Sequence, residues 1–147
     1  MRKYIYIGIG GFIGAILRFI IKDFFSGQYQ GSFPFDTLLI NTLGCFLLAL
    51  IMSVALEVLE LSSNLRLGIA TGLLSAFTTF STICKEASSL IFQGLFFQAI
   101  LYAASTLLLG FIAIYLGIAV SREIIRARVE RKKSDMTNNS AEKSEEQ

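Results

Sequence analysis

A cluster of hydroxyl side chains interrupts one of the apolar segments of this chain. The run Thr78–Thr82 (Thr-Thr-Phe-Ser-Thr) lies in the middle of residues 67–92, a segment long enough to cross a membrane. Polar groups in hydrocarbon need partners, so a helix that faces lipid does not carry such a cluster. Threonine hydroxyls also bind nearby carbonyls and loosen the helical hydrogen-bond ladder. We therefore predict a helix that is broken inside a protein-lined cavity.

The composition places the whole chain in a membrane. Hydrophobic residues make up 54% of its 147 residues and the mean hydropathy is +0.64, more than a soluble domain of this size carries. Four segments approach the roughly 20 apolar residues that a spanning helix needs. They are residues 4–21, 35–56, 67–92 and 96–120. The predicted fold is an all-α integral membrane protein with four transmembrane helices, the third of them broken, in one domain over residues 1–121.

The chain changes character twice beyond the fourth span. Residues 122–133 are rich in Arg and Lys, and residues 134–147 are polar. An anionic membrane leaflet attracts basic residues next to a span, which accounts for this charge without a nucleic-acid partner. We predict that residues 122–147 form a basic, then polar, cytoplasmic tail that is partly disordered.

The reactive side chains do not favour an enzyme. The sequence has no histidine, and both cysteines, Cys45 and Cys84, lie inside predicted spans, where we expect small buried hydrophobes rather than metal ligands or a disulfide. Ser81 has no base near it in sequence to activate it as a nucleophile. Glu86 is the only carboxylate in the middle of a predicted span. These residues indicate a membrane protein without catalytic chemistry.

The polar groups inside the spans are nearly all neutral hydrogen-bond donors. They are Asn41, Thr42, Ser75, residues 78–82, Tyr102 and Thr106. A path lined by hydroxyl and amide donors fits a small anion better than a cation or a proton relay. A helix broken at residues 78–82 also leaves carbonyl oxygens unpaired, and these suit a cation such as Na⁺. Four short helices hardly enclose a path alone, so we expect at least a dimer.

Two polar side chains admit two interpretations each. Asn41 lies about one turn inside the second span, where an amide either bonds a neighbouring helix or lines a pore. Arg18 lies three residues before the end of the first apolar segment. There it either extends to the membrane surface or holds a buried polar partner.

Three motifs occur in an order that is typical of one known family. Residues 10–18 read Gly-Gly-Phe-Ile-Gly-Ala-Ile-Leu-Arg, and residues 37–46 read Thr-Leu-Leu-Ile-Asn-Thr-Leu-Gly-Cys-Phe. With the Thr-Thr-Phe-Ser-Thr run, they resemble the G-G-x-x-G-A-x-x-R, T-L-x-x-N-x-x-G-S-F and T-T-F-S-T motifs of the CrcB/Fluc fluoride channels. Glu86 stands where that family usually has Glu, and Tyr102 with Thr106 resembles its fourth-helix tyrosine and hydroxyl neighbour. The resemblance covers about residues 8–117.

The resemblance implies an antiparallel, dual-topology dimer with two narrow fluoride paths and a structural Na⁺ at its centre. It implies passive export, in which fluoride formed from HF inside the cell leaves down its gradient, so that its toxicity falls. The residues that would line the fluoride path are Asn41, Phe80, Ser81, Thr82, Tyr102, Thr106 and Arg18. The backbone carbonyls of Thr78 and Ser75 would hold the Na⁺.

Three positions depart from the family pattern. Ile83 stands where the family has the second phenylalanine of its "Phe box", and an aliphatic side chain offers no polarised ring edge. Cys45 replaces a usual serine, and Ser75 stands where the family usually has a Na⁺-binding glycine. The departures at Ile83 and Ser75 lie at sites that the resemblance makes functional.

The distribution of charge predicts one orientation in the membrane. Four spans put both termini and the 57–66 loop on one side, with nine Lys and Arg residues counted up to Lys133, against two on the other side. This bias of seven (9 − 2) predicts that both termini are cytoplasmic, in a multi-pass protein of the cell membrane. A chain that inserts both ways should be nearly balanced. The partner is therefore either a second copy or, as the charge favours, an oppositely oriented paralogue.

Two other functions compete with a fluoride channel. A small dual-topology, proton-coupled drug or cation exchanger needs a carboxylate inside the membrane, and Glu86 is the candidate. A structural scaffold without transport predicts that Asn41→Ala or Phe80→Ile changes stability alone. The fluoride channel is the leading interpretation.

Overall fold

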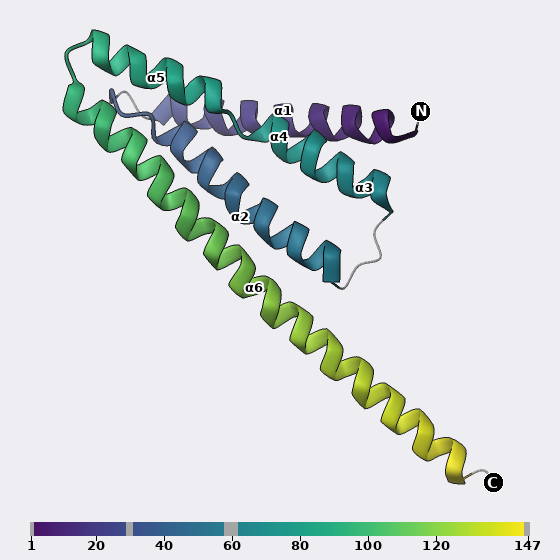
Figure 1. The fold of residues 1–147 in the computed structure, drawn as a ribbon. Helices are drawn as coiled ribbons and strands as arrows, with labels where there is room; N and C mark the ends of the chain where they lie inside the picture. Colours follow the sequence, from purple (N-terminus) through teal and green to yellow (C-terminus); the bar gives the residue numbers. More distant parts are fainter. Residues whose placement is uncertain (1, 29–30, 58–61, 146–147) are drawn as a thin grey trace.

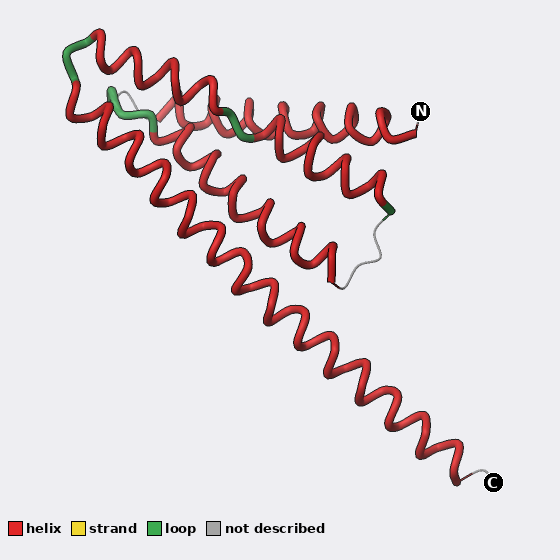
Figure 2. The backbone as a smooth tube through the Cα atoms, in the orientation of Figure 1, coloured by secondary structure: helices red, strands yellow, loops and turns green. Residues whose placement is uncertain are grey.

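The computed structural model describes the backbone of residues 2–28, 31–57 and 62–145, and the side chains of residues 2–25, 31–55 and 62–131. Within these ranges the chain consists of helices joined by short loops, without a strand (Figure 2). Four helical stretches are long and apolar enough to cross a membrane. They are Arg2–Phe25, Phe35–Ala55, Ser63–Phe92 and Phe96–Arg131. The predicted all-α membrane fold with four spans is confirmed.

Seven helical elements make up these spans. They are α1 (Arg2–Gln28), α2 (Phe35–Glu57), α3 (Ser63–Leu67), the π-helix η1 (Gly68–Leu74), α4 (Ser75–Phe77), α5 (Phe80–Phe92) and α6 (Phe96–Glu145). The third span is thus assembled from α3, η1, α4 and α5, and a loop separates α4 from α5 within it (Figures 1 and 2). The break in the third helix, predicted from its hydroxyl cluster, is present.

Helices α1 and η1 pack backbone against backbone. A Cβ added to Gly10 would collide with the carbonyl oxygen of Gly68, and one added to Gly14 would collide with that of Leu73. Glycine at these positions lets the two helices approach closely, as small residues do between membrane helices. The other main contact of the bundle joins α2 to α6, the long helix that runs diagonally in Figure 1.

Helix α6 extends far beyond the membrane span. It remains helical through Glu145. The partial disorder expected of residues 122–147 stays a prediction. Arg, Lys, Glu and Ala are good helix formers, and Glu123 and Arg126 form an ion pair of 3.2 Å one turn apart, so the basic segment continues the helix. The extension projects away from the other helices (Figure 1).

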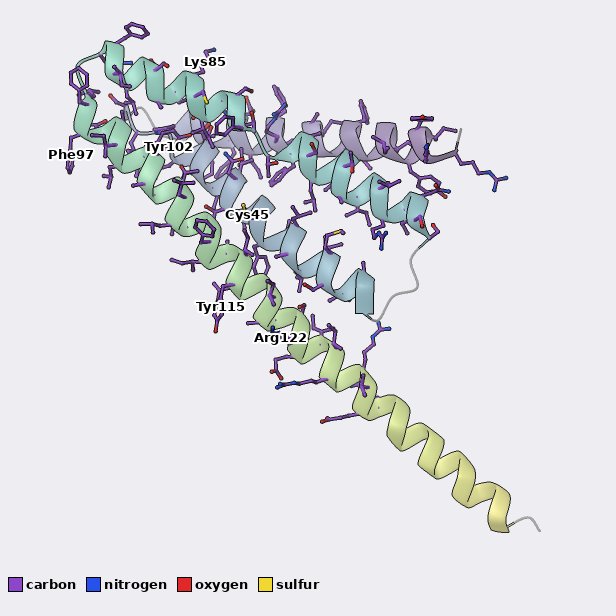
Figure 3. All side chains as sticks on the ribbon, in the orientation of Figure 1. Cys45, Lys85, Phe97, Tyr102, Tyr115 and Arg122 are labelled. Carbon is purple, nitrogen blue, oxygen red and sulfur yellow. The ribbon has the colours of Figure 1, made fainter. Side chains whose placement is uncertain are left out.

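A single chain leaves most of its apolar surface uncovered. One small core cluster joins Leu38, Leu90, Ala99 and Tyr102. By contrast, Phe97 and Tyr115 of α6 are 77% and 73% exposed and point away from the bundle (Figure 3). Such surface suits lipid or another subunit rather than water.

Candidate functional site

The break in the third span consists of two extended residues. Helix α4 ends at Phe77, and the backbone is extended at Thr78 (φ −79°, ψ 158°) and at Thr79 (φ −153°, ψ 113°). Phe80 already begins α5, so Ser81 and Thr82 lie in its first turn. The interruption is therefore narrower than the five-residue run from which it was predicted.

Asn41 of α2 holds the broken backbone. Its Oδ1 accepts a hydrogen bond of 2.8 Å from the Thr79 N–H, and its Nδ2 donates one of 3.3 Å to the Thr79 carbonyl. Both groups are buried, so the amide replaces two hydrogen bonds that the helix has lost. The amide has a second Nδ2 proton, and Asn41 also lines a cavity, so the side chain fits both interpretations that the sequence left open.

The break leaves two carbonyl oxygens without the N–H partners that a continuous helix would give them. In an unbroken helix the Thr79 N–H would bond the Ser75 carbonyl, but here it bonds Asn41. The Thr82 N–H would bond the Thr78 carbonyl, but it bonds Thr79 Oγ1 at 3.3 Å as the N-cap of α5. Ser75 and Thr78 are the two residues predicted to offer carbonyls to Na⁺. Within the described ranges no group of three or more His, Cys, Asp or Glu side chains gathers.

An apolar cavity of about 500 Å³ opens on one side of the break. It lies among α2, the third span and α6, and Asn41, Thr78, Phe80, Ile83 and Thr106 belong to its lining. Phe80 is 78% exposed there, whereas Ile83 is half-buried against the small core cluster. Ser75 also lines this apolar cavity.

A charged cavity of about 510 Å³ opens at the other side. Arg18 and Lys22 of α1 line it together with Lys85 and Glu86 of α5. Lys85 projects from the outer face of α5 (Figure 3). The remaining lining residues are Thr79, Ser81 and Thr82. Thr79 belongs to both linings, so the extended backbone separates the charged cavity from the apolar cavity.

Three hydroxyls stand together where the charged cavity meets the break. Thr79 Oγ1 lies 3.3 Å from Ser81 Oγ and 3.0 Å from Thr82 Oγ1. Two mutual contacts use two of the three hydroxyl protons. One proton therefore remains for a ligand in the charged cavity. Thr79, which the sequence did not single out as a site residue, is the centre of this group.

Glu86 is bound by side chains from three helices. Thr37 of α2 donates a hydrogen bond of 2.8 Å to its Oε1, and Tyr102 of α6 donates one of 2.8 Å to its Oε2. Lys22 of α1 forms an ion pair of 3.2 Å with Oε1. Tyr102 is fully buried, and its carbonyl accepts a hydrogen bond of 2.8 Å from Thr106. The Tyr102 hydroxyl, predicted to line the path, is thus directed at Glu86 and lies outside both cavity linings.

The predicted site residues therefore form two groups and one outlier. Arg18, Ser81 and Thr82 meet at the charged cavity, and Asn41, Phe80, Thr106, Ser75 and Thr78 meet at the apolar cavity. Tyr102 reaches the charged cavity only through Glu86. The sequence did not single out Lys22 and Thr37 as site residues, and the signal that points to them is their placement at the ends of apolar segments.

Comparison with known proteins agrees with this arrangement. Residues 5–118 match the family model described as "CrcB-like protein, Camphor Resistance (CrcB)". A "Fluoride-specific ion channel FluC" of Prosthecochloris aestuarii is 43% identical over 116 residues, which cover 79% of this chain and 90% of that protein. "Fluoride-specific ion channel FluC 1" of Moorella thermoacetica is 40% identical over 119 residues, 81% of this chain and 85% of that protein. A "Fluoride-specific ion channel FluC" of Thermus thermophilus is 38% identical over 117 residues, 80% of this chain and 93% of that protein.

The match reaches into all four spans and includes the break in the third and every residue of both cavity linings, whereas the basic end of α6 lies beyond it. The family is one of ion channels, not of enzymes. The chain belongs to the CrcB family.

Proposed function

We propose that this chain is a subunit of a fluoride channel that lets fluoride leave the cytoplasm down its gradient. The observation that carries the proposal is the position of the break, between a cavity lined by cations and hydroxyls and a cavity lined by an amide and a phenylalanine ring. Its relatives are named fluoride-specific ion channels.

The residues of the two cavities suit a small, strongly hydrated anion. Arg18 and Lys85 attract anions into the charged cavity, where the free hydroxyl proton replaces part of the hydration shell. On the other side, the second Nδ2 proton of Asn41 and the positive ring edge of Phe80 offer further donors. Fixed donors on both sides of Thr79 compensate an anion for the water that it loses.

A structural Na⁺ fits the carbonyls that the break releases. Ser75 and Thr78 would hold it, because the Thr79 and Thr82 N–H groups bind elsewhere. Its positive charge would tie the two halves of the third span together. We expect the thermal midpoint of the purified protein to rise when NaCl replaces N-methylglucamine chloride. An equal midpoint in both salts would contradict the Na⁺ site.

The exposed ring of Phe80 and the open apolar cavity call for a second subunit. Phe80 is 78% exposed at the cavity edge, and an oppositely oriented partner would cover it and close the path. The nine-to-two charge bias favours a related chain of opposite orientation over an identical copy. With Ile83 in place of a second ring, one of the two paths would be the working one. Finding half of a C-terminal tag outside the cell would contradict the fixed orientation.

Growth of bacteria that lack their own fluoride exporter tests the function. Expression of this chain, with its oppositely oriented paralogue where one is needed, should restore growth in acidic medium that contains fluoride. Asn41→Ala, produced in equal amount, should not restore it. Failure of the wild-type chain in both settings would contradict the proposal.

The geometry does not favour the exchanger. A carboxylate that trades protons for cations must be free to bind both, and Glu86 is held by Thr37, Tyr102 and the cation of Lys22. Proton-coupled cation efflux that Glu86→Gln abolishes would reverse this conclusion.

A further inference from the structure

Lys22 is an ion-pair partner of two carboxylates beside the charged cavity. Its Nζ lies 3.2 Å from Glu86 Oε1 and 3.2 Å from Asp36 Oδ2. One ammonium group thereby joins α1 to α2 and to α5. Its side chain is 33% exposed and that of Glu86 is 22% exposed, so water screens this pair less than a surface pair.

The other partners of Glu86 leave its charge uncompensated. Thr37 and Tyr102 each donate one hydrogen bond to it, and both are fully buried. Neutral donors stabilise a carboxylate but do not cancel its charge at a distance. Lys22 supplies the opposite charge by direct contact.

An unpaired carboxylate in the charged cavity would repel the anion that the cavity attracts. Arg18 and Lys85 line the cavity as well, but among the described residues neither forms an ion pair with Glu86. Two like charges several ångströms apart repel each other. At the effective dielectric near a protein surface, this repulsion lowers the binding constant of an anion by about tenfold or more. The charge of the residue that pairs with Glu86 therefore determines whether the cavity attracts or repels anions.

We propose that Lys22 is a specificity-determining residue that neutralises Glu86 and so keeps the entrance to the break attractive to anions. This inference rests on the proposed function, because it assigns Lys22 a role in anion passage. The first span would then contribute to anion selectivity through Lys22, in addition to its glycine-mediated packing against η1.

Glu86, rather than Asp36, is the carboxylate that matters for passage. Asp36 lies in the first turn of α2, where the free N–H groups of the helix end stabilise negative charge. It does not belong to the lining of the charged cavity, whereas Glu86 does. Neutralising Glu86 should therefore remove the need for Lys22, and neutralising Asp36 should not.

A double-mutant cycle in fluoride efflux from liposomes tests the role of Lys22. Lys22→Met should lower the efflux rate by about tenfold when Glu86 is present, and by less than twofold in the Glu86→Gln protein. Gln keeps the size of Glu and its capacity to bond Thr37 and Tyr102. Lys22→Arg keeps the charge and should keep most of the efflux. Asp36→Asn should give no such rescue.

Lys85→Met is the matched control, because it removes one positive charge from the same cavity without breaking an ion pair among the described residues. Its effect should be smaller than that of Lys22→Met and equal with Glu86 or Gln at position 86. Size-exclusion chromatography of each variant checks that the assembly is intact.

Three results would overturn the inference while the wild-type protein conducts fluoride. They are wild-type efflux in Lys22→Met, an equal loss from Lys22→Met with Glu86 and with Gln, and complete loss of efflux in Glu86→Gln alone. The last result is independent of whether Lys22→Met folds. An absence of fluoride efflux in the wild-type protein would instead contradict the proposed function.

Discussion

Replacing Asn41 by alanine should weaken the fold at the break. The mutation removes the hydrogen bonds of 2.8 and 3.3 Å to the backbone of Thr79 and leaves a buried N–H and a buried carbonyl unpaired. Hydrogen bonds between membrane helices contribute about 0.6 kcal/mol on average and about 1.7 kcal/mol at most. Two of them give an expected loss of about 1–3 kcal/mol in the free energy of unfolding.

Reversible unfolding in mixed micelles, followed by far-ultraviolet circular dichroism as the fraction of SDS rises, measures this loss. Thr42→Ala is the matched control on the same helix, because Thr42 donates to Leu38 of its own helix, and it should cost under about 0.5 kcal/mol. Asn41→Asp should cost more than alanine, because a carboxylate oxygen would face the Thr79 carbonyl. Equal stability of Asn41→Ala and Thr42→Ala would refute the stabilising role of the Asn41–Thr79 hydrogen bonds.

Two further substitutions test other contacts of the fold. Gly14→Ala drives a Cβ into the η1 backbone and should lower the free energy of unfolding by about 1–3 kcal/mol, whereas Gly8→Ala, with no atom within 4 Å, should change it by under about 0.5 kcal/mol. Tyr102→Phe leaves Glu86 Oε2 without its donor and should cost about 1–3 kcal/mol, whereas Tyr115→Phe, at an exposed position, should be neutral. The same unfolding measurement compares each pair, and equal effects within a pair would contradict the packing.

The spans and the break could be predicted because their causes are local in the sequence. About 20 apolar residues suffice to identify a spanning helix. A hydroxyl cluster inside the third span indicates an interruption, but not its length. Thr79 caps α5, so Phe80, Ser81 and Thr82 remain helical, and only Thr78 and Thr79 are extended. Which threonine acts as the cap depends on the Asn41 contact from another helix, and the sequence does not contain that pairing.

The environment of Glu86 could not be predicted, because it depends on the packing of distant segments. Lys22 and Thr37 are 64 and 49 residues away from it in sequence. Tyr102 was predicted as a donor to the path, but tertiary packing turns its hydroxyl to the carboxylate. The charges at helix ends were visible in the sequence, but their partners were not.

The partial disorder of the tail stays a prediction, and its sequence also favours a helix. Its polar composition favoured partial disorder, but its Arg, Lys, Glu and Ala residues also have high helix propensity, and an existing helix needs no new nucleus to continue. Helix α6 therefore continues to Glu145.

Fluoride efflux from liposomes, recorded with a fluoride electrode while valinomycin and K⁺ balance the charge, tests the central claim most directly. The chain would be reconstituted alone and together with its oppositely oriented paralogue. We predict rapid fluoride efflux, with no matching chloride efflux and no need for a proton gradient, from at least one of the two preparations. Fluoride release no faster than from protein-free liposomes in both preparations would contradict the account.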